Sequence, residues 1–199
     1  MGLKFQYNKT SLQQLQKQLN IRKNALPTLQ AKEAALRMEV KKAKKEFKMA
    51  EEAYQQEKKK LEAIQQLWPE FQPRILQRVN INLNAIRIAG IKTPVLEHIT
   101  FTIQPFSLFS LPPWFPAGLI LFKTCKELHI KIEVIRKKIT ILEYARKKTT
   151  QKVNLYEKVQ IPEYQHAIRK INRFLEDEDN LSKSSQKVLK NRMEAMVGI

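Results

Sequence analysis

Apolar residues recur at alternating spacings of three and four between residues 12 and 68. The positions that carry this repeat are Leu12, Leu15, Leu19, Leu26, Leu29, Leu36, Val40, Ala43, Phe47, Ala50, Tyr54, Leu61, Ile64 and Trp68. A seven-residue repeat keeps one narrow apolar stripe on one side of a helix, and in water such a stripe is stable only against a facing helix. The pattern therefore predicts a long N-terminal helix with a partner.

A second periodic segment, from about residue 119 to residue 181, can supply that partner. Its apolar positions are Leu121, Cys125, Leu128, Ile132, Ile135, Ile139, Leu142, Val153, Tyr156, Tyr164, Ile168, Ile171 and Leu175. The two segments have similar lengths and are separated by a short middle region, so they predict an intramolecular antiparallel coiled coil.

The middle of the chain has the periodicity of strands. Val79, Ile81 and Leu83 alternate with asparagines, and residues 91–103 are again rich in residues that favour strands. A turn at Ala89–Gly90 would join the two runs into a β-hairpin. The expected fold is mainly α, a long antiparallel coiled coil of N- and C-terminal helices with a small hairpin and loop region between them. The expected regions are 1–70, 71–118 and 119–199.

Local signals mark where the helices begin and bend. Thr10 or Ser11 should cap the first helix, because each offers a side-chain oxygen and is followed three residues later by glutamine. Pro27 lies inside the repeat, which resumes beyond it, so we expect a kink and not an end. Near Pro162 the spacing of apolar residues gains a four-residue step, which predicts a local unwinding of the supercoil.

Three charged residues interrupt the first apolar stripe, namely Arg22, Glu33 and Glu57. We expect these side chains to meet charges on the antiparallel helix. If the numbers of facing residues add to about 197, Arg22 lies near Glu176 and Glu57 lies near Lys138.

The segment 106–116 is too rich in proline for a regular element and too apolar for a free loop. It either forms a small satellite core at the end of the coil or docks on a neighbouring protein or a membrane surface. We expect Trp114, Phe115 and Phe109 to be exposed here and to form a partner-docking cluster.

Composition argues against an enzyme. The four glycines are too scattered for a phosphate-binding loop, and the single cysteine, Cys125, cannot form an internal disulfide. Cys125 falls in the apolar repeat, which favours a buried thiol over a nucleophile. The three histidines lie far apart, without metal-ligand spacing. We therefore expect no catalytic residue, no cofactor and no metal.

The chain carries a formal net charge of +18 over 199 residues. Three interpretations stay open: binding of nucleic acid or an anionic membrane, a solvated coiled-coil exterior, and a positive shaft inside a negative sleeve. No stretch reaches 18 apolar residues and the N-terminus lacks a secretory signal, so a soluble, cytoplasmic protein without direct membrane insertion is expected.

The run from Lys152 to Pro162 resembles the R-V-N-A-L-E-x-x-x-I-P signature of the D subunit of V-type and archaeal-type ATPases. Five residues match it in place, and they are Val153, Asn154, Glu157, Ile161 and Pro162. The N-terminal pattern of Lys9, Leu12, Leu15 and Leu19 is similar to the start of that family, and Gly90–Pro94 is similar to its hairpin segment.

This resemblance implies a central rotor shaft that transmits torque between a catalytic hexamer of A and B subunits and an ion-translocating membrane ring. It also implies contacts with the F subunit and with a funnel-shaped central-stalk subunit above the ring, and a cytoplasmic location peripheral to the membrane. It implies no nucleic acid. The alternative is a basic coiled-coil scaffold that binds nucleic acid or an anionic membrane surface.

Overall fold

The computed structural model describes residues 5–70, 76–105, 107, 109 and 111–197, with the backbone alone at 68, 70, 76–78 and 197. The elements are helix α1 (Lys9–Ala63), the 3-10 helix η1 (Gln65–Glu70), strands β1 (Leu76–Ile88) and β2 (Ile91–Ile103), helix α2 (Phe115–Asn154), the π-helix η4 (Leu155–Gln160) and helix α3 (Ile161–Val197). The fold is mainly helical, with long helices in contact with a central antiparallel hairpin, so the expected fold class is confirmed.

The chain forms two compact units. One unit combines residues 1–31 with 149–199, and the other contains residues 32–148. The division into regions 1–70, 71–118 and 119–199 concerns the order of parts along the chain and stays a prediction.

Helix α1 begins earlier than its sequence indicated, and the predicted caps are wrong. Asn8 is the cap, because its Oδ1 accepts the backbone N–H of Ser11 at 2.7 Å. Ser11 in turn accepts the backbone N–H of Gln6 through its hydroxyl at 3.4 Å. Asparagine satisfies a free N–H of the first turn at least as well as serine or threonine does, and the capping pattern is thus shifted by a few residues.

The two prolines inside the helical segments act differently. Helix α1 continues through Pro27, in line with the expectation that it would not end there. Before Pro162 the helix widens into η4, where the N–H of Ile161 bonds to the carbonyl of Tyr156. Pro162 has no N–H, and its ring would clash with the carbonyl four residues earlier. A π-turn upstream accommodates that ring, so the predicted irregularity takes the form of a π-helix.

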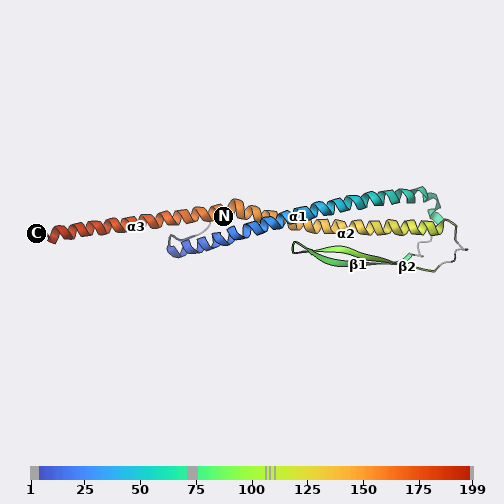
Figure 1. The fold of residues 1–199 in the computed structure, drawn as a ribbon, viewed down its shortest axis with the longest axis horizontal. Helices are drawn as coiled ribbons and strands as arrows, with labels where there is room; N and C mark the ends of the chain where they lie inside the picture. Colours follow the sequence, from blue (N-terminus) through green and yellow to red (C-terminus); the bar gives the residue numbers. More distant parts are fainter. Residues whose placement is uncertain (1–4, 71–75, 106, 108, 110, 198–199) are drawn as a thin grey trace. The chain divides into compact units, whose positions relative to one another are not determined.

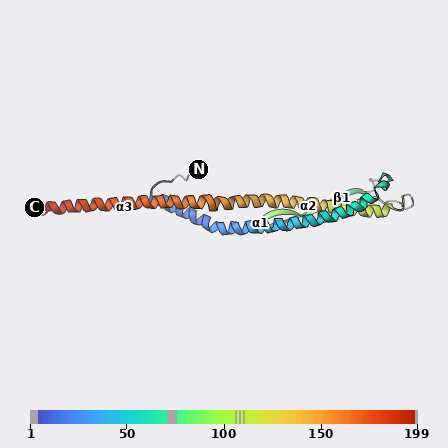
Figure 2. The same cartoon turned by 90° about the horizontal axis from the view of Figure 1, so that it is seen from above.

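In the unit that contains both chain ends, α1 packs against α3. Leu15 and Leu19 are buried against Tyr164, Ala167 and Ile171. At the start of α1 the ring of Tyr7 lies 5.0 Å from that of Phe174, measured between centroids. Beyond this contact α3 extends past the beginning of α1, and every residue from 176 to 196 is exposed (Figures 1 and 2).

In residues 32–148, α1 packs against α2. Leu36, Val40, Ala43 and Leu142 form one buried cluster. Ala50 forms a second buried cluster with Ile132 and Ile135. Both clusters draw their residues from the predicted apolar repeats.

The antiparallel register differs from the predicted one, which is wrong by almost four helical turns. Arg22 bonds to Gln160 and Lys138 pairs with Glu46, so the numbers of facing residues add to about 183 and not to 197. The register prediction placed Arg22 near Glu176 and Glu57 near Lys138, and the structure shows neither contact. Helix α2 starts at Phe115, four residues before the predicted segment, and the C-terminal part of α3 lies beyond the start of α1.

The hairpin confirms the predicted strands and turn. Ile88 pairs with Ile91, and the turn between them places Ala89 at φ 49° and Gly90 at φ 80°. Two positive φ values are typical of the tight turn that suits strand twist. The tip packs through Ile88, Ala89 and Ile91 on the cluster that contains Leu36. The hairpin therefore runs alongside α2 (Figure 1).

Candidate subunit-contact sites

The predicted seam residues fall into two groups by burial. Buried members are Leu15, Leu19, Leu36, Val40, Ile132, Ile135, Leu142, Val153 and Ile171. Half-buried members are Leu12, Leu26, Leu29, Phe47, Leu61 and Ile139. Of these, Leu12, Phe47 and Ile139 pack directly on buried clusters. The side chain of Trp68 lies outside the described residues.

Arg22 occupies a polar position in the stripe, but it does not meet the predicted carboxylate. Its Nε donates to Oε1 of Gln160 at 2.7 Å, and its Nη1 donates to the carbonyl and side-chain oxygens of Gln18. The guanidinium lies 4.5 Å from the ring centroid of Tyr164 and 5.9 Å from that of Tyr156. Neutral acceptors and aromatic faces thus solvate the cation.

The expected proximity of Arg22 to Glu176 is therefore wrong. Glu176 lies four to five helical turns beyond Gln160 along the helix, roughly 24 Å at about 1.5 Å per residue. The sequence held a signal for the observed partners of Arg22. Tyr156, Gln160 and Tyr164 are spaced four residues apart, and side chains at that spacing share one face of a helix.

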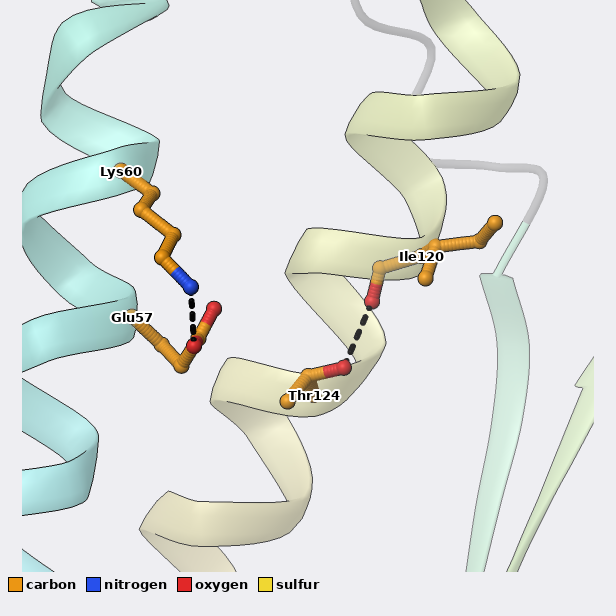
Figure 3. Close-up of polar contacts among 4 residues, drawn as sticks. All are labelled: Glu57, Lys60, Ile120 and Thr124. Carbon is orange, nitrogen blue, oxygen red and sulfur yellow. Dashed lines mark hydrogen bonds and ion pairs between the residues drawn. The ribbon is translucent and has the colours of Figure 1, made fainter.

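The other two interruptions make ion pairs on their own helix. Glu33 pairs with Arg37 at 3.2 Å, and Glu57 pairs with Lys60 at 2.6 Å. Figure 3 shows the second pair on the side of α1 that faces the first turns of α2. Lys138 pairs with Glu46, so the predicted pairing of Glu57 with Lys138 is also wrong. A partner three or four residues along the same helix needs no interhelical register.

The residues of the family signature lie around the π-helix. Val153 is buried near the end of α2, which ends at the exposed Asn154. Glu157 is exposed within η4, and Ile161 packs against the cluster that contains Leu15. Pro162 is exposed in the first turn of α3. The signature therefore combines seam residues with the irregular turn and outward-facing side chains.

The proposed docking aromatics do not form one exposed cluster. Phe115 is fully buried with Leu119, against Ile103 and Leu111, so its expected exposure is wrong. Trp114 is half-buried and packs across Gly118, where an added Cβ would lie 2.8 Å from the indole ring. Phe109 is fully exposed. Phe106 and Leu108 lie outside the described residues.

Phe115 is buried while Phe109 is exposed for a local reason, because Phe115 belongs to the first turn of α2. Its backbone N–H donates to the carbonyl of Pro112 at 3.0 Å, and Pro116 follows at a position where a missing N–H costs little. The helix start turns Phe115 toward the base of the hairpin. Pro116 followed by a long apolar repeat was the sequence signal for this helix start.

A groove of about 640 Å³ lies between β2, α1 and α2, within residues 32–148. Its apolar walls are formed by Met49, Ala50, Ala53, Val95, Leu96, Leu128, Val134 and Ile135. Glu46, Glu97, Lys131 and Lys138 add charge. The hairpin is held at its tip and at its base, which leaves this middle part open.

The single cysteine has a buried environment. Cys125 is buried, and burial followed by the negative charge of Glu57 raises the pKa of its thiol. In the part of the chain that the structure describes, no three His, Cys, Asp or Glu side chains could hold one metal ion. None of the described helices is both long and apolar enough to cross a bilayer.

Comparisons with known proteins agree with the signature. The family model of the ATP synthase D subunit matches residues 11–191. The D subunit of the V-type ATP synthase of Borreliella burgdorferi is 28% identical over 192 residues, which cover 96% of this chain and 95% of that protein. The D subunit of the V-type ATP synthase of Chlamydia muridarum is 26% identical over 199 residues, which cover 98% of each chain.

The match spans both helical segments and the hairpin, so it rests on more than coiled-coil composition. Together with the paired helices, the hairpin and the signature around η4, it shows that the chain belongs to the D-subunit family of V-type ATP synthases, the family of their non-catalytic central-stalk subunit.

Proposed function

We propose that this protein transmits torque between a catalytic hexamer of A and B subunits and the ion-translocating membrane ring. The observation that carries the proposal is the match to the D-subunit family over residues 11–191. The helix pairing supports it, since a shaft that carries torque needs helices that do not slide. Buried clusters join the helices in each unit, and two ion pairs, Lys44–Glu143 and Glu46–Lys138, cross between α1 and α2.

The part of α3 beyond residue 176 is the proposed contact with the hexamer. Its apolar residues are exposed, with Leu181 at 70% and Met193 at 69% of full exposure. A surrounding sleeve of other subunits would cover them.

Rotation can be tested by tethering this part of α3. A Met193→Cys variant, in an assembled complex with a cysteine on a facing catalytic subunit, should lose at least about tenfold in ATP hydrolysis when cross-linked. Reduction should restore the activity. The same variant without the second cysteine is the control. Full hydrolysis in completely cross-linked complexes would refute rotation of this protein.

We propose that the F subunit and the funnel-shaped subunit bind the unit that contains residues 32–148, near the base of the hairpin. Phe109 supports this contact because its ring is fully exposed, and Trp114, five residues further along the chain, is half-buried at the start of α2. Phe115 contributes indirectly, because it is buried in the small core with Leu119, Ile103 and Leu111.

A Phe109→Ala variant should weaken copurification of these partners, since aromatic anchors often contribute about 2 kcal/mol or more to an interface. Met38→Ala is the control, because Met38 is an exposed apolar residue on α1. Unchanged assembly of the Phe109 variant would remove this residue from the proposed contact. Binding that disappears steeply with salt and requires nucleic acid or anionic vesicles would instead favour a basic scaffold.

A further inference from the structure

The two strands of the hairpin differ in exposure. Every β1 residue from Asn80 to Arg87 is exposed, including Ile81, Leu83 and Ile86 at 45%, 51% and 48%. In β2, Thr93 is buried and Val95 and Leu96 are half-buried against the helices. β1 is therefore the outer strand of the sheet.

Half of the backbone groups of β1 point away from β2. In a hairpin with a two-residue turn, the residues that flank the turn form a hydrogen-bonded pair, and the pairing then alternates. Ile88 and Ile91 flank the turn, so the N–H groups of Arg87, Ala85 and Leu83 point outward. In agreement, the N–H of Ala85 donates to the side-chain Oδ1 of Asn84 at 2.8 Å.

Between residues 80 and 87 of β1 and their partners on β2, only the β2 edge carries the features that block pairing with another chain; the extra residue that β1 has at Gln77 lies outside this stretch. β2 contains Pro94 at an outward position and Lys92 beside the turn. The register shift between Asn82 and Leu83 places an extra residue on β2, opposite a regular stretch of β1. β1 has no proline and no lysine. Proline, lysine and bulges are the usual protections of a sheet edge, and an edge without them is a template for a further strand.

We propose that β1 from Asn80 to Arg87 is a docking edge for an extended strand of another subunit of the V-type ATP synthase. The strand would add to the sheet through backbone hydrogen bonds, and its apolar side chains would cover Ile81 and Leu83. β1 contains Arg78 and Arg87 and no Asp or Glu. Charge complementarity therefore requires a partner strand that carries carboxylates.

Hydrogen exchange at single-residue resolution tests this proposal. The full chain is measured alone and in the intact V-type ATP synthase complex, purified through a tag on another subunit. The outward N–H groups of Leu83, Ala85 and Arg87 should exchange at least about tenfold more slowly in the complex. Equal exchange in both samples would overturn the proposal. The proposed function would survive that result, because it is tested separately, by copurification with the complex and by the loss of ATP hydrolysis on cross-linking at Met193.

Two variants at one position provide the matched comparison. Ala85→Pro removes an outward N–H without taking a hydrogen bond from β2, while Ala85→Val keeps it. In the complex, protection of Leu83 and Arg87 should be lost in the proline variant and kept in the valine variant. Loss in both variants would overturn the proposal. Protection in the isolated chain that grows with its concentration, together with a dimer in light scattering, would assign the edge to a second copy and overturn it too.

Discussion

At the scale of single residues, polar side chains in an apolar stripe find partners close at hand. Arg22 uses Gln18 on its own helix and Gln160 on the facing one, with the rings of Tyr164 and Tyr156 beside its guanidinium. A half-buried cation is stable when its N–H donors have acceptors and when its loss of hydration is small. Neutral acceptors satisfy the donors, and aromatic faces interact favourably with the charge. The arrangement fixes α1 against η4 and α3 at a defined register.

Arg22→Met should therefore lower the free energy of unfolding by about 1 to 2 kcal/mol, because charged hydrogen bonds and the ring contact are lost while the aliphatic part is retained. Lys23→Met, at the exposed neighbouring position, is the control and should stay within about 0.5 kcal/mol of the parent. Urea unfolding followed by circular dichroism measures both. Equal midpoints for the two variants would show that the Arg22 contacts add nothing to stability.

Cys125 should react slowly with alkylating reagents. Burial and, to a smaller degree, the charge of Glu57 raise the pKa of its thiol, while Lys60 opposes this. Since the folded chain then holds the proton more tightly than the unfolded chain, this group lowers stability as pH rises above the usual thiol range. Iodoacetamide rates across pH, compared with those of free cysteine, test the direction. Glu57→Gln should move the reaction profile to lower pH, and a shift to higher pH would contradict the assignment.

At the scale of elements, helix length and helix pairing are separate properties. α3 continues to Val197, although its contacts with α1 and with Tyr7, just before α1, end near Phe174 and Leu175. Propensity and local charge pairs such as Lys190–Glu194 maintain the unpaired part. The paired part depends on burial of its apolar stripe.

A matched pair of leucines tests this difference. Leu142 is fully buried between α1 and α2, so Leu142→Ala should cost about 2 to 5 kcal/mol in unfolding free energy. Leu181 is 70% exposed, and Leu181→Ala should change stability by less than about 0.5 kcal/mol. Thermal unfolding of the isolated chain measures both. A large loss in the Leu181 variant would show that the C-terminal part of α3 is packed in solution.

At the scale of the whole molecule, the net charge of +18 lies mainly on exposed faces of the helices. Lys44 pairs across the helices with Glu143, and Lys48 lies near Glu52 on its own helix. Both pairs are solvent-exposed, so their contribution to the fold is small and screened by salt. The charge therefore concerns interactions with other subunits more than folding.

Reversing Lys44, Lys45 and Lys48 to glutamate should leave the helical signal nearly unchanged, since each exposed charge is worth at most about 1 kcal/mol. The Lys44 change should contribute most, because it places a second carboxylate beside that of Glu143. Circular dichroism and thermal midpoints check the fold, and coupling of ATP hydrolysis to ion movement in the assembled complex checks the function. An unfolded chain would contradict the assignment of these lysines to the exterior.

The sequence by itself determined which elements form. The apolar repeats around Leu36 and Leu142 require facing helices, and the alternation at Ile81 together with Ala89–Gly90 requires a hairpin, because these signals depend only on local spacing. The four-residue step in the apolar spacing near Pro162 also marked the place where the helix becomes irregular. The alternation in β1 changes phase between Leu83 and Ile86, which was an available signal for the nearby register shift.

Only the tertiary structure decided which residues face each other. A repeat allows helices to slide by whole heptads at little local cost, so the pairing of Arg22 with Gln160 follows from where α2 begins and how the middle region connects the helices. The burial of Phe115 and the exposure of Phe109 have the same origin, because both are aromatic residues in one apolar segment. A helix start and the hairpin base beside it, which no local pattern specifies, place one ring in a core and leave the other exposed.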